Sequence, residues 1–159
     1  MPLFGIDRFF GLLCASLVLC AHPVVAAADE PAPVVTQHQI RVGDRTLAYT
    51  AEAGRVPIGD VATGEALGRM FYIAYRMPAE PGKIRPIAFI WNGGPGMPAA
   101  SLNFEGVGPR RIEGPVLVDN ADTLLTDADL VFVDPVGTGF SRAVSTEAHL
   151  VEVLDHNAV

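Results

Sequence analysis

Two apolar segments that each end in a glycine-rich loop constrain the fold of this chain more than any other feature. The first is IAFIW at residues 87–91, followed by NGGPG, and the second is LVFV at residues 130–133, followed by DPVGTGFSR. Short runs without polar residues are typical of strands that are buried on both faces of a sheet. Glycine-rich loops present backbone N–H groups with no Cβ in the way. The pair therefore predicts two neighbouring strands of one sheet whose following loops form one site.

The first 28 residues have the pattern of a secretory signal peptide. Arg8 supplies a short basic start, residues 9–20 are apolar, and small residues end the segment. The apolar part is too short for a comfortable membrane span. Both cysteines, Cys14 and Cys20, lie in this segment, so its removal leaves a chain without thiols. We therefore expect an exported protein, periplasmic or extracellular, without a membrane span after cleavage. A retained N-terminal anchor is the main alternative, and a lipoprotein acylated at Cys20 is disfavoured by the bulky Leu19 before it.

The charge and the histidines argue against several classes of function. The formal net charge is −7, and the chain lacks the basic footprint of nucleic-acid-binding proteins, so no nucleic-acid partner is expected. His38 is predicted to be a surface residue, and His149 and His156 lack a third ligand, so no metal site is expected. The sequence GTG at residues 137–139 lacks the third glycine of a dinucleotide fingerprint, so no cofactor is expected.

The pattern along the chain is one of short strands and turns, with few segments of helical spacing. The expected elements are a β-hairpin formed by residues 39–42 and 46–50, a loop or edge excursion at 53–65, a strand at 69–76, a polar turn at 78–85, the two buried strands, and a short helix at 97–104. Parallel strands need crossover helices, and those expected here are too few to cover both faces of a sheet. The sequence therefore predicts that the chain is the N-terminal part of a larger α/β domain.

Four motifs in the same order resemble the N-terminal part of the secreted serine carboxypeptidases, and their bacterial members in particular. They are WNGGPG at residues 91–96, GPRR at 108–111, and the segments 120–125 and 129–142. The resemblance covers residues 34–143. It implies the N-terminal part of an α/β-hydrolase fold, with an incomplete central sheet and an N-terminal β-hairpin. It also implies removal of single residues from the C-termini of peptide or protein substrates through an acyl-enzyme.

The expected domain boundaries follow from the signal pattern and this resemblance. They are a signal peptide at residues 1–28, a mobile lead-in at 29–33, the peptidase segment at 34–143, and a tail of unassigned structure at 144–159.

The resemblance also assigns roles to three residues of the first loop. Gly94 matches the glycine whose backbone N–H forms half of the oxyanion hole, and Asn92 matches the asparagine that helps to hold the terminal carboxylate of the substrate. Gly93 lies between them along that site. The chemistry agrees with these roles, because N–H groups aimed at a developing negative charge stabilise it. An asparagine amide donates to a carboxylate without adding a charge.

The chain departs from the family pattern in two places. Met97-Pro98-Ala99 stands where the family has small residues that include serine or cysteine. The nucleophile motif Gly-x-Ser-x-Gly is absent, and the aspartate and histidine of the triad are expected further downstream. We therefore expect this chain to be a truncated piece that is inactive alone.

Three residues of the second half are interpreted as structural. Ser141 follows the strand end by several residues, so it is expected to line the cleft rather than to act as the nucleophile. Asp134 is expected to cap the loop around Gly137. Arg110 is expected to support the cleft by pairing with an acid such as Asp134.

Two further hypotheses stay open. An α/β-hydrolase aminopeptidase or esterase can carry a similar Gly-Gly-Pro-Gly loop, commonly with histidine at the position of Asn92. A non-catalytic exported module is the alternative from another class.

Overall fold

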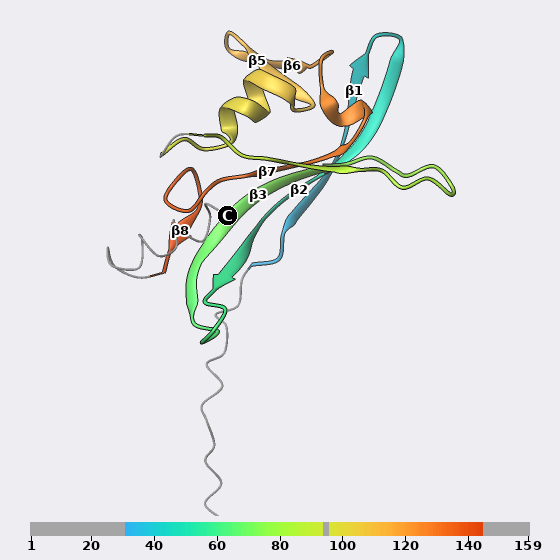
Figure 1. Cartoon of the computed structure of the whole chain (residues 1–159). Coiled ribbons are helices and arrows are strands. Elements are labelled where there is room, and N and C mark those ends of the chain that lie inside the picture. Colours follow the sequence, from blue (N-terminus) through green and yellow to red (C-terminus); the bar gives the residue numbers. More distant parts are fainter. Residues whose placement is uncertain (1–30, 94–95, 145–159) are drawn as a thin grey trace, which may run out of the picture.

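The computed structural model describes residues 31–93 and 96–144 of the chain, and a mixed β-sheet forms its centre (Figure 1). The strands and short helices in chain order are β1 (Val34–Val42), β2 (Arg45–Gly59), β3 (Ala66–Arg76), β4 (Ile87–Ile90), η1 (Leu102–Val107), β5 (Arg110–Glu113), β6 (Val116–Asp119), η2 (Leu124–Thr126), β7 (Asp129–Val133) and β8 (Arg142–Ala143). In these residues, no helix is long and apolar enough to cross a membrane.

The sheet has the strand order β1-β2-β3-β7-β4, and β8 also pairs with β3. Neighbouring strands are antiparallel except for β4 and β7, which run parallel. β5 and β6 form a separate hairpin beside η1 (Figure 1). The prediction that the two apolar segments are neighbours in one sheet is confirmed.

The N-terminal hairpin is also confirmed, and it is longer than the sequence predicted. β1 pairs with β2 from Val34–Ala53 to Val42–Arg45, and Gly43 turns the chain at a φ of +62°. Only glycine adopts this left-handed backbone without a steric cost, which explains the sharp turn.

The expectation of a loop or an edge excursion at residues 53–65 is wrong up to Gly59, because β2 continues to that residue and pairs with β3. Gly54 lies opposite Tyr72, and a Cβ at Gly54 would stand 2.9 Å from the Tyr72 hydroxyl oxygen. The tyrosine ring thus occupies the space that a side chain at position 54 would fill. The glycine that suggested a break in the strand instead makes room for a cross-strand contact.

β4 lies at one end of the strand order, and it is covered on one face only. Ala88 and Ile90 pack against the core, whereas Ile87 and Phe89 are 59% and 63% exposed. Successive side chains of a strand point to opposite faces, so the two pairs face opposite ways. The strand was correctly located, but the prediction of burial on both faces is wrong for the described residues.

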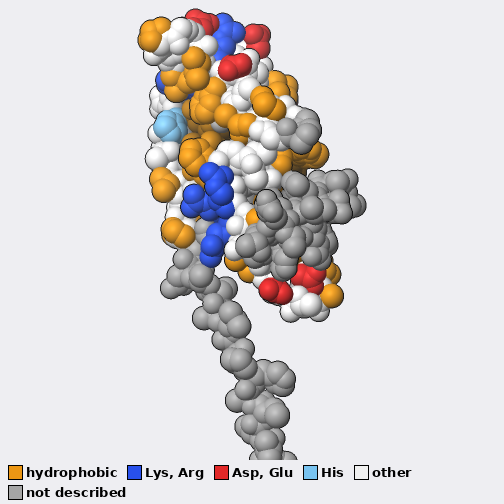
Figure 2. Space-filling model, turned by 90° about the vertical axis from the view of Figure 1, so that its left-hand side faces the viewer, with side chains coloured by type: hydrophobic (Ala, Val, Ile, Leu, Met, Phe, Trp, Pro, Cys, Tyr) orange, Lys and Arg blue, Asp and Glu red, His pale blue; other side chains and the backbone are white. Residues whose placement is uncertain are grey.

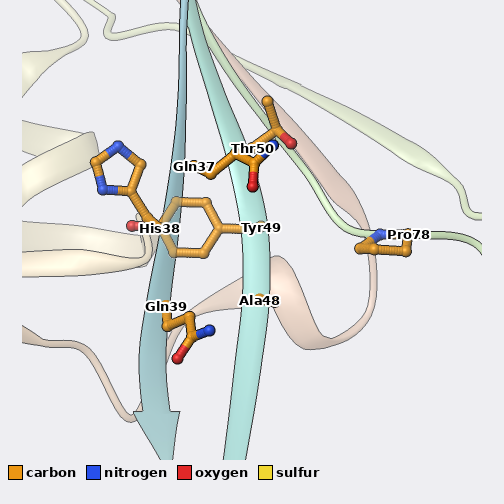
Figure 3. Close-up of a pocket in the computed structure, with 7 residues that line it drawn as sticks. All are labelled: Gln37, His38, Gln39, Ala48, Tyr49, Thr50 and Pro78. Carbon is orange, nitrogen blue, oxygen red and sulfur yellow. The ribbon is translucent and has the colours of Figure 1, made fainter.

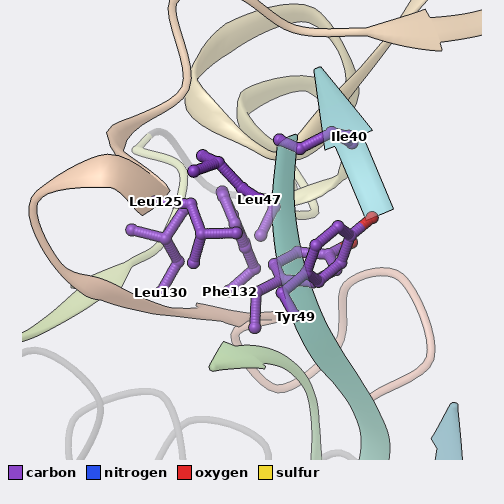
Figure 4. Packing of buried hydrophobic residues seen from close by; sticks show 8 residues of the cluster. Ile40, Leu47, Tyr49, Leu125, Leu130 and Phe132 are labelled. Carbon is purple, nitrogen blue, oxygen red and sulfur yellow. The ribbon is translucent and has the colours of Figure 1, made fainter. Parts of the chain in front are cut away.

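The hydrophobic core lies between one face of the sheet and the segment from Ala99 to Ala128. The expected helix at residues 97–104 is shifted, since helical structure begins at Ala100 and η1 ends at Val107. Pro98 explains the late start, because proline is disfavoured inside a helix. Figure 4 shows side chains from the N-terminal hairpin and from residues 125–132 converging in this core, among them Leu47, Tyr49, Leu125, Leu130 and Phe132.

A mostly buried ion pair attaches the turn at residues 78–85 to the sheet. Arg85 Nε donates to Asp129 Oδ1 at 2.8 Å, and its Nη2 donates to the Leu125 carbonyl at 2.6 Å. The same carboxylate oxygen accepts from the Met77 N–H at 3.2 Å. Both ionic side chains are less than one-fifth exposed, at 18% and 16%. Asp129 therefore connects the end of β3, the approach to β4 and the start of β7.

We expect Asp129→Ala to lower the free energy of unfolding of the full chain by about 2–3 kcal/mol, because it leaves the Arg85 guanidinium without its partner. Glu113→Ala is the matched control, since the Arg111–Glu113 pair is exposed and such pairs contribute less than about 1 kcal/mol. Chemical denaturation measures both values. Equal effects of the two substitutions would contradict the role given to Asp129.

Candidate functional site

The loops that follow β4 and β7 leave the sheet at the same end. The two strands are parallel and in register, with Ile90 beside Phe132. Ligands commonly bind at the carboxyl ends of parallel strands, where the following loops meet. The candidate site is therefore formed by the loop after β4, residues 91–99, and the loop after β7, residues 134–141.

The carboxylate of Asp134 joins these two loops. Its Oδ1 accepts from the Ala99 N–H at 2.9 Å, and its Oδ2 accepts from the Phe140 N–H at 3.0 Å. The Asp134 N–H donates to the Phe71 carbonyl at 3.0 Å, which ties the start of the loop to β3. The side chain is buried, with 6% of the residue exposed. The expected structural role in the loop around Gly137 is confirmed, and the contact with Ala99 extends it to the other loop.

Gly139 makes the close approach of the second loop possible. Its φ is +45°, and a Cβ there would overlap the Asp134 Oδ2 atom. A side chain at this position would therefore meet both backbone strain and a steric clash with the carboxylate. Glycine at position 139 is required for Asp134 to reach the Phe140 N–H.

The loop after β4 is folded back onto the start of the helix by Asn92. The amide Nδ2 of this half-buried residue donates to Ser101 Oγ at 2.9 Å and approaches the Pro98 carbonyl at 3.4 Å. Gly93 is exposed, and a Cβ there would meet no atom within 4 Å. Gly94, the residue expected to supply the oxyanion N–H, lies outside the described residues.

Ser141 is part of the protein interior, so the prediction that it lines the cleft is wrong. It is 0% exposed, its Oγ donates to the Asp134 carbonyl at 2.6 Å, and the same oxygen accepts from the Phe71 N–H at 2.7 Å. These two bonds connect the loop after β7 to β3. The hydroxyl thus satisfies two backbone groups that would otherwise be buried without partners.

Arg110 does not pair with Asp134, which corrects the expected contact. It begins β5, lies opposite Asp119 of β6, and approaches the carboxylate of that residue at 3.4 Å. It also lies beside the phenol of Tyr49. Burial raises the pKa of Tyr49 above its ordinary value, although the nearby guanidinium opposes the shift. Arg110 therefore attaches the β5–β6 hairpin to β2, away from the two loops.

A small hollow of about 70 Å³ lies beside Asp134. The sheet contributes Phe71 and Phe132, the helix contributes Phe104, and the second loop contributes Phe140. Phe71 and Phe140 are in ring contact, with their centroids 5.1 Å apart. The two-loop site thus adjoins a mainly aromatic surface.

A larger hollow of about 430 Å³ lies against β1 and β2 near Pro78, away from the two loops (Figure 3). Its polar lining includes Gln37, Gln39 and Thr50. The exposed His38, predicted as a surface residue, stacks on Tyr49 with ring centroids 5.4 Å apart. His38 also lines the hollow, and its Nε2 lies 2.7 Å from the Thr36 Oγ1 atom. The candidate site is nevertheless placed at the two loops, because ligands commonly bind at the carboxyl ends of parallel strands.

No group of three histidine, cysteine, aspartate or glutamate residues that could hold a metal ion occurs in the part of the chain that the structure describes. His149 and His156 lie outside the described residues.

Two hydrogen bonds of the site were not predicted from the sequence. Ser101 accepts from the Asn92 amide across nine positions of the chain, and nothing in the local pattern marks this pair. The buried Asn103 donates to the Tyr75 hydroxyl at 3.0 Å and lines the small hollow beside Asp134. Burial raises the pKa of Tyr75, although its hydrogen bond with Asn103 opposes this shift. A polar residue within the expected helix was the available signal for Asn103.

Gly139→Ala is expected to destabilise the full chain more than Gly114→Ala does. Gly114 also has a left-handed backbone, with φ +58°, but a Cβ there meets no atom within 4 Å. The left-handed backbone alone costs about 1–2 kcal/mol for an alanine. Displacement of Asp134 should add about 1–3 kcal/mol from the unsatisfied N–H groups. Denaturation of both variants measures the difference, and equal losses would refute the proposed fit between Gly139 and Asp134.

Comparison with known proteins matches the chain to one family model and to several curated relatives. The family described as serine carboxypeptidase matches residues 47–158. "Serine carboxypeptidase-like 36" of Arabidopsis thaliana is 35% identical over 90 residues, which cover 55% of this chain and 19% of the relative. "Pheromone-processing carboxypeptidase KEX1" of Verticillium alfalfae is 46% identical over 66 residues, or 40% of this chain and 10% of the relative. "Serine carboxypeptidase-like 45" of Arabidopsis thaliana is 28% identical over 122 residues, or 69% of this chain and 26% of the relative.

The aligned part of the chain thus spans about a quarter or less of these curated relatives. The family match covers most of the sheet, both loops and the η1 segment between them. The mixed sheet with few helices agrees with a partial domain of the α/β-hydrolase type. From the family match and this architecture, the chain belongs to the serine carboxypeptidase family.

Proposed function

We propose that the protein containing this chain is a serine-type carboxypeptidase, which removes C-terminal residues from peptides through an acyl-enzyme. The observation that carries this proposal is the WNGGPG loop, which leaves β4 beside the loop anchored by Asp134. Both loops lie within the segment that matches the family. The substrate is the free C-terminus of a peptide or protein.

In this proposal the first loop recognises the substrate and stabilises the charge of the reaction. The N–H of Gly94 donates to the oxyanion that forms when a serine attacks the last peptide bond. Such donors typically lower the barrier of acyl transfer by about 3–4 kcal/mol. The Asn92 amide and the Gly93 backbone hold the terminal carboxylate. Asn92 is suited to this role because its longer contact, 3.4 Å to the Pro98 carbonyl, is weak enough to be exchanged for a carboxylate.

The nucleophilic serine, the aspartate and the histidine of the triad come, in this proposal, from outside residues 1–159. Residues 1–28 act as a signal peptide, so that the enzyme works in the periplasm or outside the cell. The chain supplies the oxyanion donor and the carboxylate site, and the chemistry requires the remaining groups to be brought to the same loops.

Peptides with a free C-terminus are expected to be cleaved by the protein expressed from its complete reading frame, and the same peptides with an amidated C-terminus much less so. The amide has no charge for the Asn92 site to recognise, and loss of a charged hydrogen-bond partner costs about 1.5–3 kcal/mol. Release of the last residue, followed by mass spectrometry, gives kcat/KM for each peptide. Equal rates on both peptides would argue for an esterase or another type of peptidase.

Asn92→Asp is expected to raise KM for free-acid peptides about tenfold or more, because a carboxylate repels the substrate carboxylate and donates no hydrogen bond. The Ser101 hydroxyl can still donate to the new side chain, so the loop keeps this link. Ser101→Ala is the control, since it removes the link but leaves the Asn92 amide in place. A loss of equal size in both variants would mean that Asn92 acts only by folding the loop.

A further inference from the structure

Three arginines lie side by side on the face of the sheet that carries the core. Arg69 of β3 lies directly opposite Arg142 of β8 and opposite Pro57 of β2. Arg55 stands two residues before Pro57 and therefore points to the same face. Figure 2 views the side of the molecule on which β8 lies in Figure 1, and it shows a group of Lys and Arg side chains near the middle of this face, besides others near its top. We refer to Arg55, Arg69 and Arg142 as the arginine patch.

The patch is unusual in a chain whose formal net charge is −7. Like charges directly opposite each other across strands are destabilising. Elsewhere in the described part of the chain, four arginines pair with carboxylates: Arg76 with Glu52, Arg85 with Asp129, Arg110 with Asp119, and Arg111 with Glu113. The register positions that lie between Arg55 and Arg142 on this face hold Pro57, Phe71 and Arg69, and the last of these has an interaction of its own within the chain.

The two outer arginines of the patch are exposed, and one of them is held in place. Arg142 Nη1 donates to the carbonyls of Gly139 at 2.8 Å and Ser141 at 2.7 Å. A guanidinium has five N–H donors, so its Nε and Nη2 groups can still meet a carboxylate. Arg69 makes a further interaction within the chain. The argument therefore rests on Arg55 and Arg142, which flank it.

The patch adjoins the candidate site through the loop after β7. β8 pairs with β3 at Gly68 and Arg69, just beyond the point where β7 ends opposite Tyr72. Phe140 lies between Asp134 and Arg142 along the chain, and it lines the hollow beside the carboxylate. A peptide that extends from the two-loop site across Phe140 therefore arrives at the arginine patch.

We propose that the arginine patch binds acidic side chains of the peptide substrate, located upstream of the residue that is removed. This inference rests on the proposed function, because it extends the same site. The charge complementarity selects acidic peptides, and Phe140 provides an apolar surface for the peptide between its C-terminus and its acidic residues.

Binding of two short acetylated peptides to the protein from the complete reading frame tests the proposal. The peptides share the same C-terminal residues and carry either two glutamates or two glutamines upstream. At low salt, isothermal titration calorimetry should show the glutamate peptide binding about tenfold more tightly, since each exposed ion pair contributes a few-fold. The preference should shrink as salt is added, because exposed charges are screened.

The double variant Arg55→Gln and Arg142→Gln should lose the preference, whereas Arg45→Gln, an exposed arginine near the β1–β2 turn, should keep it. Equal affinity of the wild-type protein for the two peptides, or no affinity for either, would overturn the proposal. So would a double variant that retains the preference. A double variant that loses thermal stability while keeping the preference would instead indicate that an acidic segment of the chain itself covers the patch.

Cleavage of the two peptides separates this proposal from the proposed function. If the wild-type protein binds the glutamate peptide preferentially but releases no C-terminal residue from either peptide, binding of acidic side chains by the arginine patch is supported and the carboxypeptidase assignment fails. If both peptides are cleaved with the same kcat/KM and bound equally, the assignment stands and the patch proposal fails.

Discussion

The carboxylate of Asp134 is the interaction on which the candidate site depends. The parallel pairing of β4 and β7 brings two loops to one end of the sheet, but strand pairing alone does not fix how the loops lie. Asp134 does so by accepting one N–H from each loop. A buried carboxylate that accepts backbone N–H groups forms charge-assisted hydrogen bonds, which are stronger than neutral ones. The position of the first loop is therefore set from the end of the neighbouring strand.

The strands that precede and adjoin the two loops also hold them in place. Leu130 and Phe132 of β7 are buried in the core under the loops, and β3 is connected to the second loop by the Ser141 hydroxyl. At the opposite end of β7, Asp129 joins three segments through Arg85 and the Met77 N–H. One short strand thus carries an aspartate contact network at each end, with apolar packing between them.

Sequence reasoning succeeded where the deciding interactions are local or periodic. The adjacency of the two apolar strands, the turn at Gly43 and the structural role of Asp134 all followed from patterns of a few residues. Sequence reasoning failed where contacts between distant segments of the chain determine the structure. Gly54 suggests a break in the strand, because the sequence does not show that Tyr72 occupies the space beside it. Ser141 suggests a cleft residue, because the sequence does not show its hydrogen bond with the Phe71 N–H. The partner of Arg110 could have been predicted from the sequence. Gly114 and Pro115 mark a hairpin turn, and that turn places Asp119 opposite Arg110. The carboxylate role of Asn92 and the oxyanion role of Gly94 are still predictions from the family resemblance.

The contact between Gly139 and Asp134 also restricts how related sequences can diverge. Because the carboxylate fills the space where a Cβ would stand, the two positions should vary together rather than independently. A lineage that keeps an acid at position 134 must keep glycine at 139. One that shortens position 134 to serine or alanine becomes free to accept asparagine at 139, which tolerates the left-handed backbone, and must then hold its two loops together by other means.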